Sequence, residues 1–119
     1  MKNIFLDYYT TYTKTLIEDC IPYWLRHGKD GSGAINNCIS EDGTLLSRDR
    51  YIWSQGRALW TFSAMYNRID KNSEYLEFAK GIFNYLLDIR QKNGKVWNYL
   101  YSSEGDVKEG NISIYVDFM

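Results

Sequence analysis

Three side chains in one expected helix have the types and spacing to hold a polar ligand. Trp53, Arg57 and Trp60 are separated by four and then three residues, which places them on the same side of a helix. An arginine does not lose its charge inside a protein, so burying it requires an anionic or hydrogen-bonding partner. Arg57 therefore either pairs with a structural acceptor such as Asp49 or Asp117, or lines a cavity where a ligand supplies the acceptor.

The chemistry that Arg57 favours is recognition of an oxygen atom on a small molecule. A guanidinium has a fixed charge and forked N–H donors, which can hold a carbonyl or hydroxyl oxygen and an enolate that forms there. Indole rings such as that of Trp53 can pack against the apolar faces of sugars or bases. Packing in a protein core is the alternative for each aromatic residue, and for Trp60 in particular.

The composition limits the classes of partner. The chain has 119 residues, a net charge of −1 and 24% charged residues, which suits one small domain and does not favour binding to nucleic acid or an anionic membrane. No apolar run is long enough to span a bilayer, and Asp7 precedes any apolar core of signal-peptide length. Cys20 and Cys38 lack metal-ligand spacing and are expected to be reduced thiols. We therefore expect a soluble cytoplasmic protein without a metal site.

Hydrophobic periodicity predicts three helices that would position these residues. Apolar side chains recur every three or four residues over residues 3–27, 51–69 and 73–92. Pro22 should kink or divide the first helix, and Gly28 is a plausible end to it. The second helix is apolar on two faces and is expected to be buried, whereas the third has a polar face and is expected to lie outside it.

Two glycine-rich segments, residues 28–50 and 94–112, separate the helices. The first predicts a hairpin with strands near residues 34–39 and 44–46 and a turn at residues 41–43. The second predicts a strand at residues 96–101 followed by a turn at residues 103–106. The order of helix, loop and helix therefore repeats with a period of about 60 residues.

The apolar run at residues 113–119 predicts a further buried element that begins where the chain stops. A buried helix needs neighbours, so we expect residues 1–119 to be the N-terminal portion of a larger, mostly α-helical domain. The alternative is a short terminal strand that completes a small protein.

Two groups of residues resemble the opening of the N-acylglucosamine 2-epimerase family, which includes cellobiose 2-epimerases and aldose–ketose isomerases. They are Pro22-Tyr23-Trp24-Leu25-Arg26-His27-Gly28 and Trp53-Ser54-Gln55-Gly56-Arg57, the latter continued by Trp60-Thr61-Phe62-Ser63-Ala64-Met65-Tyr66. The resemblance covers essentially the whole chain and the N-terminal third of a family member. It implies an all-α fold, part of an (α/α)6 barrel with a sugar site in the bowl at one end. Gly33-Ala34-Ile35 departs from the Gly-Gly-aromatic run of many members.

The resemblance also implies roles for particular residues. Arg57 falls on a substrate-contacting arginine, Tyr115 on a tyrosine of a later inner segment, and Tyr51 and Trp53 on positions near the pocket. The paired histidines that transfer protons in the family lie beyond residue 119, and His27 matches a framework histidine. We therefore expect a sugar 2-epimerase or aldose–ketose isomerase that needs no cofactor, acts on a small-molecule sugar, and is inactive as this chain alone. A homodimer of the full-length form is compatible with the resemblance.

Two other functions fit parts of the pattern. A non-catalytic carbohydrate-binding or protein-interaction module would use the same helical surface without the histidines. A glycoside hydrolase would need two carboxylates facing one cavity; Asp49 and Asp117 are available, but no spacing pairs them.

Overall fold

Helices account for most of the residues that the computed structural model describes, which are residues 3–110. Two of the predicted helices continue through a π-helical turn, where each backbone N–H reaches back five residues instead of four. The helical elements are α1 (Ile4–Thr15), η1 (Leu16–Cys20), α2 (Ile21–His27), α3 (Ile52–Ala64), η2 (Met65–Ile69) and α4 (Ser73–Lys92).

The predicted first helix is confirmed as a run from α1 through η1 to α2. The π-helical turn η1 lies directly before Pro22, which occupies the first turn of α2. Proline has no N–H to donate and is tolerated at that position, so the helix adjusts its hydrogen bonding there rather than stopping. Gly28 ends α2, and its N–H donates to the carbonyl oxygen of Trp24 at 2.8 Å.

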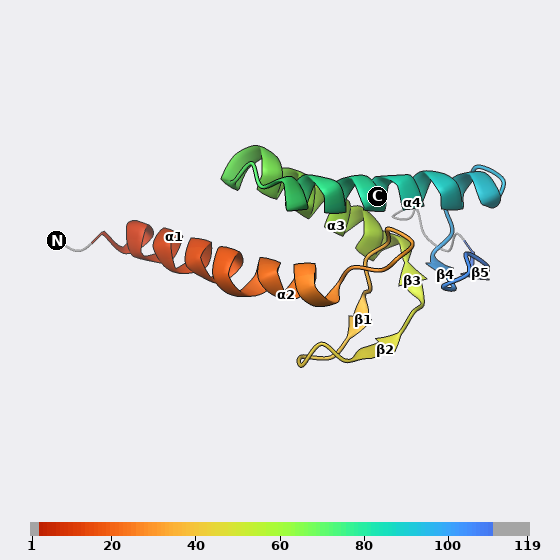
Figure 1. Ribbon diagram of the computed structural model, residues 1–119, viewed down its shortest axis with the longest axis horizontal. Coiled ribbons are helices and arrows are strands. Elements are labelled where there is room, and N and C mark those ends of the chain that lie inside the picture. The colour runs from red at the N-terminus through yellow and green to blue at the C-terminus, as the bar shows by residue number, and fades with distance from the viewer. Residues whose placement is uncertain (1–2, 111–119) are drawn as a thin grey trace.

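Helices α3 and α4 form an antiparallel pair that carries most of the core (Figure 1). The third predicted helix, residues 73–92, is confirmed at both ends. Its N-terminal cap is Asn72, whose side chain accepts from the N–H of Glu74 at 2.9 Å. Phe62 of α3 and Phe78 of α4 have ring centroids 4.4 Å apart. The main apolar cluster comprises Ile21, Ile35, Ala58, Phe62, Met65, Tyr75, Phe78, Ala79 and Ile82.

The predicted hairpin of the first glycine-rich segment is confirmed, with a shorter first strand, and the second segment holds an antiparallel pair where one strand and a turn were predicted. The first holds β1 (Cys38–Ile39) and β2 (Leu45–Ser47); the second holds β4 (Leu100–Tyr101) and β5 (Val107–Glu109). The strand β3 (Arg50–Tyr51) lies directly before α3 and pairs with β4, so the second segment adjoins the start of α3. The fold is therefore mostly helical, with two small sheets that involve the glycine-rich segments.

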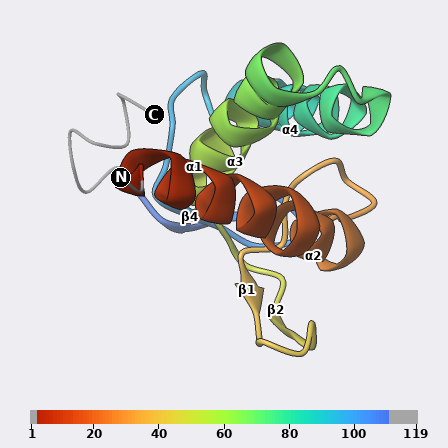
Figure 2. The same cartoon turned by 90° about the vertical axis from the view of Figure 1, so that its left-hand side faces the viewer.

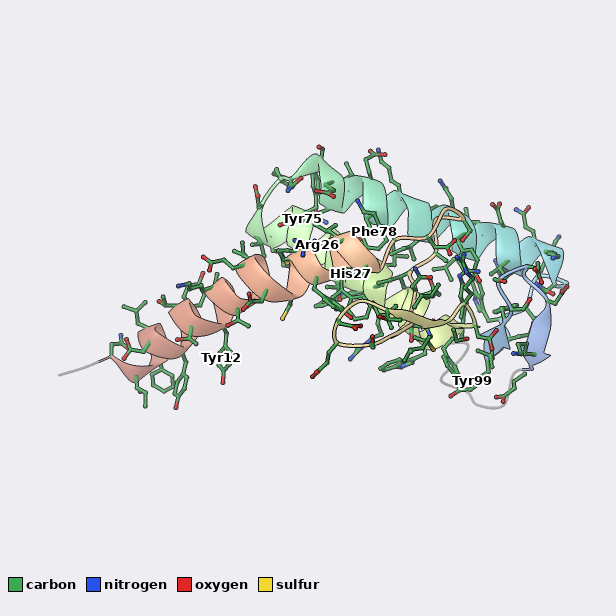
Figure 3. The ribbon with its side chains drawn as sticks, turned by 60° about the horizontal axis from the view of Figure 1, so that its bottom comes forward. Tyr12, Arg26, His27, Tyr75, Phe78 and Tyr99 are labelled. Atoms are coloured by element: carbon green, nitrogen blue, oxygen red, sulfur yellow. The ribbon has the colours of Figure 1, made fainter. Side chains whose placement is uncertain are left out.

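The helix from α1 to α2 lies in a separate layer from the α3–α4 pair (Figure 2). α1 extends away from the body and has no buried residue, and Tyr12 projects from it (Figure 3). The radius of gyration is 16.1 Å, against about 13.5 Å for a compact domain of this length. No helix in residues 3–110 combines the length and apolarity needed to cross a membrane.

Candidate functional site

A hollow of about 270 Å³ lies where α2, α3 and the first glycine-rich segment meet. Its floor is apolar and continuous with the main core, and its polar groups come from the segment and from α3. The lining residues are Ile21, Trp24, Ile35, Asn37, Trp53, Ser54, Arg57, Ala58, Thr61 and Phe62. A mostly apolar cavity with a few convergent polar groups is the usual character of a small-molecule site.

Arg57 and Trp53 both line this hollow, one helical turn apart on α3. The guanidinium carbon of Arg57 lies 5.1 Å from the centroid of the Trp53 ring, within the range of a cation–π contact. Among residues 3–110, Arg57 forms no ion pair with a carboxylate. Asp49, one of the predicted alternatives, instead pairs with Lys108, and Asp117 lies outside the described residues. Within residues 3–110, the charge of Arg57 is therefore not offset by a carboxylate.

The expectation that the second helix is buried on both faces is wrong for the part of the chain that the structure describes. Trp53 is 48% exposed and Trp60 is 64% exposed, and Arg57 is exposed as well. Ala58 and Phe62 of α3 pack in the main core with residues of α2 and α4, whereas Trp53, Arg57 and Trp60 lie on a side of α3 that the described residues leave largely uncovered. Arg57 thus meets the hollow from its rim rather than from a closed interior.

The arginine that is buried is Arg50, which the sequence analysis did not single out. Arg50 is 2% exposed. One of its guanidinium nitrogens lies 2.8 Å from Oδ2 of Asp30, and another donates to the carbonyl oxygen of Ser103 at 3.1 Å. Its guanidinium also lies 5.5 Å from the centroid of the Tyr85 ring. Arg50 therefore joins both glycine-rich segments and α4 immediately before α3 begins.

Two titratable partners of Arg50 are perturbed by these surroundings. Burial works to raise the pKa of Asp30, but hydrogen bonds from Ser32 and the charge of Arg50 outweigh it and lower the pKa below its usual value of 3.8. Burial raises the pKa of Tyr85, whose hydroxyl has no hydrogen-bond partner among the described residues. The carboxylate of Asp30 offsets the buried charge of Arg50, which suits a structural role in holding the loops.

Gln55 fixes the loop wall of the hollow. Its side chain is fully buried, and its amide both accepts from the N–H of Ile35 at 2.9 Å and donates to the carbonyl oxygen of Ile35 at 2.8 Å. The same amide nitrogen lies 3.5 Å from Oδ1 of Asn37, which also accepts from the N–H of Tyr51 at 3.2 Å. A helix-borne amide thus substitutes for a neighbouring strand and holds two lining residues in place.

Of the described residues, neither Tyr51 nor His27 lines this hollow. Tyr51 packs edge-on against Tyr99, with ring centroids 5.3 Å apart. His27 packs against Tyr23 at 5.1 Å and beside Gly43 of the first hairpin, in keeping with the expected framework role; Figure 3 shows it at the end of α2. Tyr115 lies outside the described residues.

Comparison with known proteins gives the same family as the sequence motifs. The chain is 28% identical over 74 residues to the N-acylglucosamine 2-epimerase of Rattus norvegicus and 28% identical over 78 residues to that of Bos taurus. The human protein of the same name is 24% identical over 74 residues. The chain resembles N-acylglucosamine 2-epimerases. No protein-family profile matches it.

The likeness to these epimerases is confined to part of each protein. The matched residues cover 60% of this chain with the rat protein and 63% with the bovine one, but 18% of the length of either relative. The comparisons support an epimerase-like family for this chain.

Proposed function

We propose that this chain contributes the arginine and an aromatic wall to the site of a sugar 2-epimerase or aldose–ketose isomerase. The observation that carries the proposal is the position of Arg57 at the rim of an apolar hollow, against Trp53 and without a carboxylate partner among residues 3–110. A positive group held beside a cavity and left unneutralised suits an oxygen-bearing ligand. The names of the similar proteins support a sugar as that ligand.

Epimerisation at C2 of an open-chain sugar removes the proton next to the carbonyl and returns it to the opposite face. Negative charge develops on the carbonyl oxygen as the proton leaves. Arg57 would donate to that oxygen and stabilise the enolate, because its charge is fixed and its side chain is already held on α3. The Trp53 and Trp24 rings would pack against the C–H faces of the sugar.

The proton-transfer groups of this reaction would come from outside residues 3–110. Two faces of the sugar need an acid and a base with pKa values near neutrality, for which histidine is the usual side chain. His27 is the one histidine of the chain, and it packs against Tyr23 outside the lining of the hollow. The 119-residue chain by itself is therefore expected to bind sugar without turning it over.

The same position of His27 favours a second candidate, a carbohydrate-binding module that performs no chemistry. The two functions are separated by incubating the complete gene product with mannose, N-acetylmannosamine and cellobiose in D2O and reading deuterium at C2 by NMR. Exchange with any of these sugars supports the epimerase or isomerase. Saturable binding without exchange supports the module, and neither binding nor exchange overturns both.

A further inference from the structure

The side-chain amide of Asn37 is oriented by the protein before any ligand arrives. Its Oδ1 accepts from the N–H of Tyr51 at 3.2 Å and lies 3.5 Å from Nε2 of Gln55. Both neighbours are donors, so a flipped amide would place its own NH2 group against them and lose both contacts. The oxygen of Asn37 is therefore held against the start of α3, and its nitrogen points elsewhere.

The nitrogen of Asn37 has spare hydrogen-bonding capacity. Among the described residues its partner is Sγ of Cys38 at 3.1 Å, and sulfur is a weak acceptor. An amide NH2 group carries two N–H donors, so at least one is left for another acceptor. Asn37 is half-buried and lines the hollow that Arg57 also lines.

We propose that Asn37 is a specificity-determining residue of this site, and that Gln55 is the positioning residue that orients it. The inference rests on the proposed function. Asn37 donates from the loop wall to a sugar oxygen remote from the reacting carbonyl, while Arg57 donates from the helix wall to the carbonyl oxygen. The ligand class is therefore a polyhydroxylated chain with acceptor oxygens at two separated positions.

Such a contact selects against sugars that lack the oxygen it would bind. A sugar that lacks the matching oxygen leaves an amide donor of Asn37 facing an apolar group, and a site built to bond a hydroxyl rejects analogues without one. If Asn37 contacts an oxygen away from the reacting carbon, as proposed, its loss should raise KM more than it lowers kcat.

The test is the Asn37→Asp variant of the complete gene product, assayed with the sugar that the wild type turns over best. Aspartate keeps an acceptor for Tyr51 and Gln55 but replaces the donor by a second acceptor. We expect kcat/KM to fall about 10- to 100-fold, mainly through KM. Asn84→Asp, which adds the same charge on the exposed face of α4, should leave kcat/KM unchanged. The backbone N–H of Tyr51 should stay protected from hydrogen exchange in Asn37→Asp.

A second measurement keeps the proposal testable if Asn37→Asp does not fold. Deoxygenated analogues of the best sugar are compared on the wild type and on Asn37→Ser. The wild type should discriminate against one deoxy position at least 10-fold more strongly than Asn37→Ser does. If the wild type is active and its Asn37 variants keep both its kcat/KM and its discrimination between sugars, only the role of Asn37 is overturned. A wild type that neither binds nor turns over sugar overturns the proposed function and this contact with it.

Discussion

Arg57 and Arg50 have opposite surroundings although they lie close together in the chain. Arg50 is buried against the carboxylate of Asp30, whereas Arg57 lies exposed beside an indole ring at the rim of a hollow. A buried arginine that already has an anionic partner contributes to structure, and removing that partner is costly. Arg57 has no anionic partner among residues 3–110, and an exposed arginine costs little to hold in that state.

Arg57→Ala is therefore expected to keep the fold and lose turnover. Deleting a donor to a developing oxyanion lowers kcat by about 100- to 1,000-fold, and Arg57→Lys should recover only part of this because lysine lacks the planar fork. The measurement is C2 deuterium exchange by the complete gene product, with circular dichroism to check folding. Arg68→Ala, which removes an exposed arginine of η2, is the control. Unchanged kinetics in Arg57→Ala would remove Arg57 from the mechanism.

Asp42 provides a residue-scale check of the first hairpin. The Ser40 hydroxyl, with the side chain and backbone N–H of Thr44, lowers the pKa of Asp42 to about 2. NMR titration of the side-chain carboxyl should give that value in the wild type. Ser40→Ala removes the largest contribution, so the pKa of Asp42 should move back towards 3.8. A wild-type value near 3.8 would show that the turn does not hold this geometry in solution.

The Asp30–Arg50 pair shows why some of the site could not be predicted from the sequence. Its two members lie at opposite ends of the first glycine-rich segment, and only the folded path of that segment brings them together. By contrast, the Trp53 and Arg57 contact follows from a spacing of one helical turn. Local periodicity therefore predicted the residues at the rim of the hollow, whereas which arginine is buried depends on long-range packing.

At the scale of elements, the helices could be predicted more closely than the strands. α4 begins and ends where its apolar stripe and flanking polar residues indicated. The predicted strand at residues 34–39 reduces to β1 because Ile35 bonds to the side chain of Gln55 instead of to a second strand. Because the partner of Ile35 is a side-chain amide and not a second strand, no alternation of apolar and polar residues marks this pairing in the sequence.

The attachment of the first glycine-rich segment should depend on pH through Asp30. The pKa of Asp30 is lowered in the folded protein. The stabilisation that its carboxylate gives the fold is therefore complete at pH values above the pKa in the unfolded chain, about 3.9, and is lost as the pH falls through the pKa in the folded protein. Asp30→Asn should lower the free energy of unfolding at pH 7 by about 3 kcal/mol, because it leaves the Arg50 charge buried without an anion.

Urea denaturation at pH 7, 5 and 3 checks the Asp30 prediction. The difference between the wild type and Asp30→Asn should narrow at the lowest pH, where the wild-type carboxylate begins to take up a proton. Asp106→Asn is the matched control, since the Asp106 side chain is 75% exposed and lies 3.9 Å from Lys92; its effect should be below about 0.5 kcal/mol. A constant difference across the three pH values would contradict the role of the Asp30 charge.

At the scale of the whole molecule, the chain is a helix pair with loops docked at one end and a long helix extending from the other (Figure 1). The hollow lies where these parts meet, so its shape depends on how closely the first glycine-rich segment approaches α4 as well as α3. Gly33 and Gly81 make the closest part of that approach. A Cβ atom on Gly33 would lie 2.5 Å from the carbonyl oxygen of Gly81.

Gly33→Ala should therefore destabilise the whole assembly of loop and helices. Gly33 has φ = +92°, which strains any residue with a Cβ, and the added methyl group would also press on the α4 backbone. The two effects together should lower the free energy of unfolding by about 2 kcal/mol or more. Gly31→Ala is the control, because nothing lies within 4 Å of its Cβ position; its effect should stay within about 0.5 kcal/mol. Equal stabilities of the two variants in urea would mean that the loop does not dock on α4, and the hollow beside Arg57 would lose the wall that Ile35 and Asn37 provide.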